Sequence, residues 1–196
     1  MQEAEPARVT VTDLACRRGD RMLFARLSLA LGAGEAVQVA GHNGIGKSSL
    51  LRIVAGLAPA YAGSVSVEGA IGLLDERPAL DPALPLGKAL AFWALLDGDA
   101  GTDHLRRLGL AALLDVPVRY LSTGQKKRAA LARLLGQKAQ VWLLDEPLNG
   151  LDSHAAELTE AIVAEHCASG GIAVIASHQP FRLAGMRVLP LPEYAA

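Results

Sequence analysis

Gly41-His42-Asn43-Gly44-Ile45-Gly46-Lys47-Ser48 is the stretch that decides the fold, because it fits the phosphate-binding pattern G-x-x-x-x-G-K-[S/T] at every position. The glycines let backbone N–H groups close around phosphates, Lys47 reaches the β/γ oxygens, and the Ser48 hydroxyl ligates Mg²⁺. A helix that begins near Lys47 adds its positive end. The sequence therefore predicts that this loop, together with the following Ser49, binds MgATP.

The flanking sequence supports this interpretation. Residues 36–40 alternate as a strand does, and residues 48–56 have the apolar periodicity of a helix. Strand, glycine-rich loop and helix in this order are the context that a phosphate loop requires. The alternative, a flexible glycine turn, does not need that context.

A pair of carboxylates follows a second apolar strand. Residues 141–144 are apolar, and Asp145, Glu146 and Pro147 come directly after them. The carboxyl end of a parallel strand is where ligands bind, and unpaired charges are not tolerated inside such a strand. We predict that Asp145 holds Mg²⁺ and that Glu146 polarises the attacking water. On its own, Asp-Glu-Pro would more often begin a helix or a turn.

The remaining patterns indicate an α/β fold. Its predicted parts are a phosphate-loop core with a mostly parallel sheet, a small antiparallel β subdomain and a short α-helical subdomain at about residues 78–120, in one domain that spans 1–196. Antiparallel strands are expected at 9–13 and 27–31, around a turn at 18–20. A further antiparallel layer is expected from 64–68 and 70–74. The parallel core is expected from helices at 125–136 and 154–168 and buried strands at 141–144 and 172–176.

Another motif opens the helix that follows the helical stretch. Leu121-Ser122-Thr123-Gly124-Gln125 resembles the signature of ATP-binding cassette ATPases, usually written LSGGQ, with Thr123 in place of the first glycine. Three cations follow at 126–128 and oppose the helix dipole, at a cost of about 0.3–1 kcal/mol for each exposed charge. A nearby phosphate would remove that conflict. The alternative interpretation is a solvated basic face.

Two later motifs extend the resemblance. Residues 149–152 follow the carboxylates as the family's D-loop does, and His178 follows the last buried strand as its switch histidine does. The chain is identified as a member of the ATP-binding cassette family because these motifs occur in order along nearly its whole length. The resemblance implies an ATPase with Glu146 and His178 as catalytic residues. It also implies a homodimer in which Ser122, Gly124 and Gln125 of one subunit grip the nucleotide on the other.

Two positions depart from the family's pattern. An aromatic residue usually stacks on adenine near position 18, where this chain has Arg18, whose guanidinium plane could stack instead. The Q-loop glutamine expected after Leu74 is absent, and Glu76 or Arg77 occupies its place. Glu76 could ligate Mg²⁺ or water.

Within the family the chain resembles the ATP-binding subunits of bacterial haem exporters of cytochrome c maturation. The resemblance rests on the short helical region, on residues 121–134 and on the stretch from Gly170 to Pro180. It implies an integral membrane transporter subunit as partner and a peripheral location on the cytoplasmic side of the bacterial inner membrane. Other interpretations are the motor of a different transporter, a soluble cassette ATPase of repair or translation, a phosphate-loop kinase and a nucleotide-gated scaffold.

Composition limits the partners. Nineteen Lys+Arg against twenty Asp+Glu give a net charge of -1, so no overall field attracts nucleic acid, and none is expected as a partner. Residues 1–6 lack the features of a secretory signal, and the apolar run at 89–96 is too short to span a membrane. Membrane association is therefore expected only through a partner. A hydrophobic content of 51% and a mean hydropathy of +0.27 indicate either a partly buried docking surface or a compositional bias towards alanine. Cys16 and Cys167 are isolated, which predicts free thiols.

Overall fold

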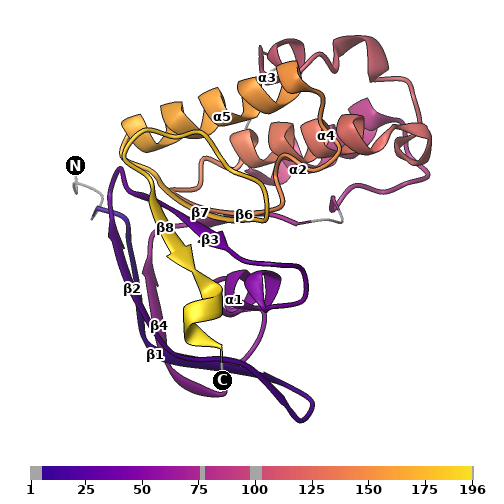
Figure 1. Ribbon diagram of the computed structural model, residues 1–196. Coiled ribbons are helices and arrows are strands. Elements are labelled where there is room, and N and C mark those ends of the chain that lie inside the picture. The colour runs from indigo at the N-terminus through magenta and orange to yellow at the C-terminus, as the bar shows by residue number, and fades with distance from the viewer. Residues whose placement is uncertain (1–5, 76–77, 98–102, 196) are drawn as a thin grey trace.

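The computed structural model describes residues 6–75, 78–97 and 103–195, which form two sheets (Figure 1). The larger sheet is parallel, with strand order β5-β6-β7-β3-β8. The smaller is antiparallel, with order β2-β1-β4. The parallel strands are β3 (Ala36–Ala40), β5 (Ile71–Leu74), β6 (Val141–Asp145), β7 (Ile172–Ser177) and β8 (Arg187–Pro190). The antiparallel strands are β1 (Arg8–Arg18), β2 (Arg21–Gly32) and β4 (Ala62–Glu68).

Helices cover both faces of the parallel sheet. Helix α1 lies between the two sheets, and α2, α4 and α5 lie on the opposite side of the parallel sheet (Figure 1). Between β5 and α4 the chain forms a helical region that contains α2, α3 and two short 3-10 helices. The helices are α1 (Lys47–Val54), α2 (Leu86–Asp97), α3 (Asp103–Arg107), α4 (Thr123–Gly136) and α5 (Ser153–Ala168), with 3-10 helices η1 (Ala111–Leu113), η2 (Val118–Tyr120) and η3 (Leu191–Tyr194).

The central strands of the parallel sheet are buried on both faces. Every residue of β6 and β7 is buried, as the unbroken apolar runs of these strands predict. Alternate side chains enter two separate cores: Leu143 and Val174 pack with α1 and the antiparallel sheet, whereas Leu144 and Ile175 pack with α4 and α5. The strand ends are thereby held rigidly, which is what a site built on them requires.

The predicted fold class is confirmed, with one wrong placement and one omission. Residues 70–74 were expected in the antiparallel layer with 64–68, but β5 pairs in parallel with β6, Ile71 opposite Val141. Gly69, at φ +110°, redirects the chain after β4, and the apolar strand that follows fits beneath α4. The pattern also gave no sign of β8, a short edge strand with an exposed Val188 and a terminal proline.

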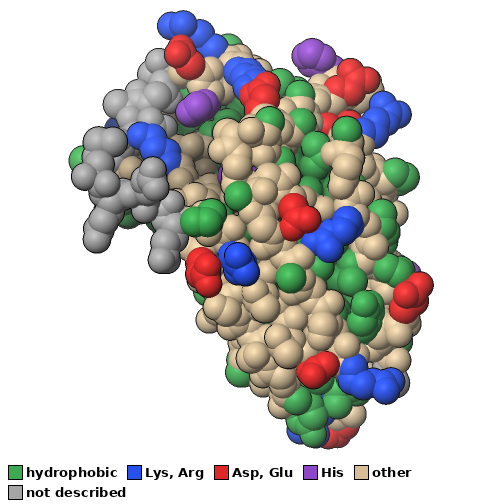
Figure 2. Space-filling model, turned by 90° about the vertical axis from the view of Figure 1, so that its left-hand side faces the viewer, with side chains coloured by type: hydrophobic (Ala, Val, Ile, Leu, Met, Phe, Trp, Pro, Cys, Tyr) green, Lys and Arg blue, Asp and Glu red, His purple; other side chains and the backbone are tan. Residues whose placement is uncertain are grey.

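The cysteines, the helices and the surface charges can each be compared with what the sequence predicts. Cys16 and Cys167 are buried and free, as expected. No helix in the described part of the chain combines the length and apolar character of a membrane span. On the face drawn in Figure 2, acidic and basic side chains are interspersed and do not gather into a patch of one sign. That face therefore lacks the basic stripe on which nucleic-acid phosphates would bind.

The junction of β1 and β4 depends on Gly63. It lies at φ +82° opposite an irregularity in β1, and a Cβ there would be 2.5 Å from the backbone oxygens of Thr12 and Asp13. Gly63→Ala should therefore lower the free energy of unfolding by about 2–4 kcal/mol, because strain and backbone overlap act together. Gly56→Ala is the control, since Gly56 has a similar φ of +71° but open space around it. Urea titration of both variants measures the difference; equal losses would show that the overlap is relieved without cost.

Candidate functional site

The phosphate loop joins β3 to α1 and is shaped around the Lys47 ammonium. Gly46 is the residue before α1 and has φ +119°; a Cβ on it would lie 3.1 Å from the Phe24 ring. Only glycine fits that turn without displacing the antiparallel sheet behind it. Lys47 is 5% exposed, and its Nζ donates to the carbonyl oxygens of Gly41 at 2.8 Å and His42 at 3.3 Å. The loop thus holds a buried cation at its centre.

Two further predicted residues join this cation. The Glu146 carboxylate lies directly after β6, with Oε1 3.4 Å from Lys47 Nζ and Oε2 2.8 Å from His178 Nδ1. The His178 backbone N–H also donates to Oε2, at 3.4 Å. The Glu146 side chain is only 12% exposed, so these interactions are weakly screened by water. Lys47, Glu146 and His178 form one connected group, which we call the catalytic cluster after the roles that the sequence predicts for Glu146 and His178.

Strand order explains why residues from distant parts of the chain meet. β7 lies between β6 and β3, so the loops that carry Glu146, His178 and Lys47 leave the same sheet edge side by side. Glu146 has φ +45°, a conformation that costs a non-glycine residue about 1–3 kcal/mol. Its backbone N–H donates to Ala176 of β7 at 2.8 Å, which fixes this strained conformation. Strain retained at such a place is typical of a functional residue.

The predicted metal ligands offer oxygen atoms of the kind that Mg²⁺ prefers. Ser48 is exposed in the first turn of α1, and the Asp145 carboxylate ends the buried strand β6. Within the described ranges no group of three or more His, Cys, Asp and Glu residues could hold a metal by itself. Mg²⁺ suits such a site, because it takes few protein ligands and fills its shell with phosphate oxygens and water. Glu76, the third predicted ligand, and Arg77 lie outside the described residues.

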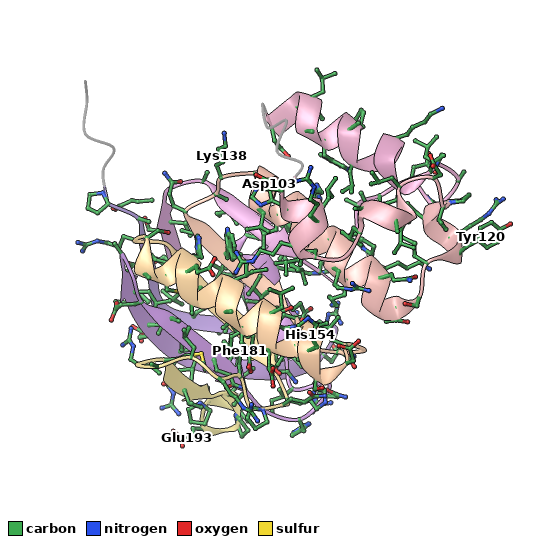
Figure 3. All side chains as sticks on the ribbon, turned by 90° about the horizontal axis from the view of Figure 1, so that it is seen from above. Asp103, Tyr120, Lys138, His154, Phe181 and Glu193 are labelled. Carbon is green, nitrogen blue, oxygen red and sulfur yellow. The ribbon has the colours of Figure 1, made fainter. Side chains whose placement is uncertain are left out.

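The signature residues form the start of α4 and are not part of the catalytic cluster of the described chain. Ser122 and Gln125 make a reciprocal cap: Gln125 N–H donates to Ser122 Oγ at 3.2 Å, and Ser122 N–H donates to Gln125 Oε1 at 2.8 Å. The Gln125 side chain is thereby committed to the helix, whereas the Ser122 hydroxyl retains its proton for donation. Tyr120, just before this turn, projects at the edge of the helical region (Figure 3).

The three cations after the signature have a structural role that the sequence did not predict. They do not form a solvated basic face, because each side chain donates to a backbone carbonyl on a neighbouring element. These contacts tie the first turns of α4 to the helical region and to the end of β6. The bonds are Lys126 Nζ to Arg119 O at 3.3 Å, Lys127 Nζ to Asp145 O at 3.3 Å and Arg128 Nη1 to Leu108 O at 2.7 Å.

Arg18 is the exposed last residue of β1. Cys16, two residues earlier, connects this end of the strand to Ser49, the residue after the phosphate loop. The Cys16 thiol hydrogen-bonds Ser49; burial raises the pKa of this thiol, while the Ser49 contact and the Arg18 charge oppose that rise. Arg17, the residue before, has its guanidinium 4.9 Å from the centre of the Tyr61 ring. The aromatic ring in this region, that of Tyr61, therefore contacts Arg17. The sequence did not predict this contact. Stacking of Arg18 on adenine stays a prediction.

A separate cavity lies away from this cluster. Its volume is about 380 Å³, and Trp142 and His166 line it as parallel rings 3.8 Å apart. Lys138 and Gln140, which precede β6, and Gly171, which precedes β7, place this cavity at the amino ends of the strands. Ligands of open parallel sheets bind at the carboxyl ends, where the catalytic cluster lies. We therefore assign the chemistry to the phosphate loop and not to this cavity.

The fold and the cluster define a phosphate-loop nucleotide-binding protein. Comparison with family models narrows the class, because the ABC transporter model matches residues 24–149. The chain belongs to the ABC transporter family, as a cassette ATPase.

Curated relatives carry one shared name. The chain is 58% identical to the cytochrome c biogenesis ATP-binding export protein CcmA of Novosphingobium aromaticivorans, over 95% of this chain and 96% of the relative. It is 47% identical to the protein of the same name from Zymomonas mobilis, over 97% of this chain and 87% of the relative. The likeness to this group that residues 121–134 and 170–180 predicted is therefore confirmed.

Solved structures support the fold. An ABC transporter ATP-binding protein from Pyrococcus furiosus superposes with a TM-score of 0.83 at 23% identity, covering 96% of this chain and all of that chain. An inward-facing metal-chelate type ABC transporter gives a TM-score of 0.78 at 21% identity, covering 95% of this chain and 80% of that chain. At these identities the likeness concerns the fold alone.

Substitution of Lys47 tests whether the phosphate loop binds ATP. Lys47→Ala should weaken ATP binding by about a hundredfold or more, because the phosphates lose a buried charge-assisted contact and Glu146 is left beside them without its cation. Isothermal titration calorimetry with ATP measures this loss. Lys138→Ala is the matched control, since Lys138 projects at the surface at the other end of β6 (Figure 3). Equal affinities for the two variants would count against the assigned site.

Proposed function

We propose that this chain, as a single ATPase domain over residues 1–196, is the ATP-binding and ATP-hydrolysing subunit of a bacterial haem exporter of cytochrome c maturation. The observation that carries the ATPase assignment is the catalytic cluster, in which Lys47, Glu146 and His178 meet beside a phosphate loop. The export assignment is supported by 58% identity, over 95% of the chain, to a cytochrome c biogenesis export protein.

Glu146 is the residue that orients the attacking water. Its Oε2 is held by His178 and its Oε1 faces Lys47, so the carboxylate cannot rotate freely. A water bonded to this carboxylate attacks the γ-phosphorus, and the bond to the β–γ bridging oxygen breaks with its electron pair going to ADP. The proton of the water passes to Glu146 or to a phosphate oxygen. The products are ADP and inorganic phosphate.

Lys47 and the residues beside it bind the phosphates. The ammonium group has three protons and is anchored on the loop carbonyls of Gly41 and His42, so it donates to phosphate oxygens from a fixed position. Ser48 and Asp145 are the residues that would hold Mg²⁺. The ion would supply positive charge against the charge that develops on the phosphate oxygens.

The signature residues complete the site of a second copy. Ser122 offers a hydroxyl proton at the start of a helix, where an anion is attracted by the dipole and by unpaired N–H groups. Because this turn is not part of the chain's own catalytic cluster, we assign Ser122 and Gly124 to the nucleotide held by the other subunit. The ATP-bound form is then a homodimer with two shared sites.

Glu146→Gln tests both hydrolysis and the dimer. The amide keeps the size of the side chain and can still bond His178, but it loses the charge that polarises water. Turnover should fall by about a hundredfold or more while ATP binding persists, and ATP should drive the variant to a dimer in size-exclusion chromatography. Glu157→Gln on the exposed face of α5 is the control and should retain turnover. A Glu146→Gln variant that binds ATP but elutes as a monomer at saturating ATP would remove the shared-site model.

The membrane subunit docks on the helical region. Phe92, Leu95 and Leu96 of α2 are exposed, and Leu95 is 82% accessible, which is unusual for large apolar side chains outside an interface. A groove of about 270 Å³ separates the end of β5 from α4 beside this region and includes Asp75 and Arg133.

We place the protein on the cytoplasmic face of the inner membrane, attached through this partner, with no nucleic-acid ligand. ATP-driven closure moves the helical region as a lever.

The export assignment is tested in the native host. A strain whose only copy carries Glu146→Gln should attach no haem covalently to c-type cytochromes, because export lacks its energy source. Haem staining of periplasmic proteins on denaturing gels measures this, and b-type haem proteins serve as the internal control. Normal c-type staining in that strain would leave the ATPase in place and refute the export assignment.

A further inference from the structure

Gln38 is a polar side chain in the middle of a strand that is otherwise apolar. It lies on β3 between β7 and β8, and its neighbours Val37 and Val39 are buried. Gln38 itself is only 7% exposed. A buried amide without hydrogen-bond partners destabilises a fold, so its partners explain why it is there.

Both ends of the Gln38 amide bond the loop that carries His178. Its Nε2 donates to the carbonyl oxygen of Gln179 at 2.7 Å, and its Oε1 accepts from the N–H of Phe181 at 3.4 Å. The two backbone groups flank Pro180, which has no N–H of its own. The loop is thus fastened to β3 immediately after the switch histidine.

Other contacts fix the same short segment. The Ser177 hydroxyl donates to Gln179 O at 2.9 Å and accepts from Gln179 N–H at 3.0 Å. Phe181 is buried in the core with Ile175, beside α5 (Figure 3). The His178 side chain, in contrast, is 39% exposed and is placed by its bond to Glu146 and by its own backbone. The backbone position of this loop therefore sets the position of the imidazole.

We propose that Gln38 is a positioning residue of the ATPase site, which acts through His178. By holding Gln179 and Phe181, it fixes the loop so that His178 Nδ1 stays within bonding distance of Glu146, and Glu146 stays aimed at water. The inference rests on the proposed function, because it takes Glu146 and His178 as residues that act on ATP. Gln38 touches neither of these side chains.

Gln38→Met in the full chain is the direct test. Methionine has a similar length and no hydrogen-bonding amide, so it fills the site but releases the loop. The kcat for ATP should fall about tenfold or more, as expected when a reacting group is misplaced, while KM changes by less than about twofold. Gln140→Met is the matched control, because Gln140 bonds the backbone N–H of Ala70 at the amino end of the sheet. Its kcat should be unchanged.

A double variant separates positioning from a general structural role. In a His178→Ala background, Gln38→Met should cause no further fall in kcat, because the residue through which Gln38 acts is gone. A multiplicative fall in the double variant, or an unchanged kcat in Gln38→Met alone, would overturn the inference. Gln38→Glu is the second variant should the methionine variant fail to fold. It can still accept from Phe181, loses the donor to Gln179 and should show the same loss of kcat without a change in KM.

Failure of the inference differs from failure of the proposed function. Wild-type chain that binds but does not hydrolyse ATP, alone or with its membrane partner, would count against the ATPase itself. If the wild type hydrolyses ATP and Gln38→Met is equally active, the ATPase assignment holds and only the role of Gln38 is refuted. Thermal unfolding of every variant confirms that the compared proteins are folded.

Discussion

The buried ion pair between Lys47 and Glu146 is the constraint around which this molecule is built. Two charges that are mostly removed from water cost several kcal/mol each unless other polar groups surround them. The loop carbonyls of Gly41 and His42 support the cation, and His178 supports the anion. The parallel sheet brings these groups together, because only adjacent carboxyl ends of β3, β6 and β7 can supply all of them without long loops.

Local patterns predict the parts of the candidate site that lie on one loop or at one strand end. The phosphate loop is contiguous, so its glycines, Lys47 and Ser48 could be identified from spacing alone. Asp145 and Glu146 were visible because charge follows an unbroken buried strand. The meeting of Glu146 with His178 was predictable only after both were placed on the same sheet edge. The strained φ of Glu146 has no signal in the sequence, since the tertiary bond to Ala176 imposes it.

The features that the sequence did not predict depend on contacts between segments that are distant along the chain. Residues 70–74 have the length and apolar character of a strand in either sheet, and only the space beneath α4 decides between them. For the cations after the signature the sequence leaves two interpretations open, a nearby phosphate and a solvated face, because it cannot show that Leu108 O and Asp145 O lie within their reach. The role of Gln38 could not be predicted for the same reason. The hydrogen-bond partners of this glutamine lie in the loop after His178, and the sequence does not show that this loop folds against β3.

The signature turn and the D-loop are in direct contact within the chain. A Cβ on Gly124 would lie 2.7 Å from the carbonyl oxygen of Gly150, so signature and D-loop backbones are in contact. Gly150 follows Glu146 by four residues, and Asp152 caps α5 by accepting from Ala155 N–H. In the homodimer that we propose, a displacement of the signature turn would therefore bear on the segment that follows Glu146. The close approach leaves no room for a Cβ at Gly124 or Gly150, which explains why both positions are glycine.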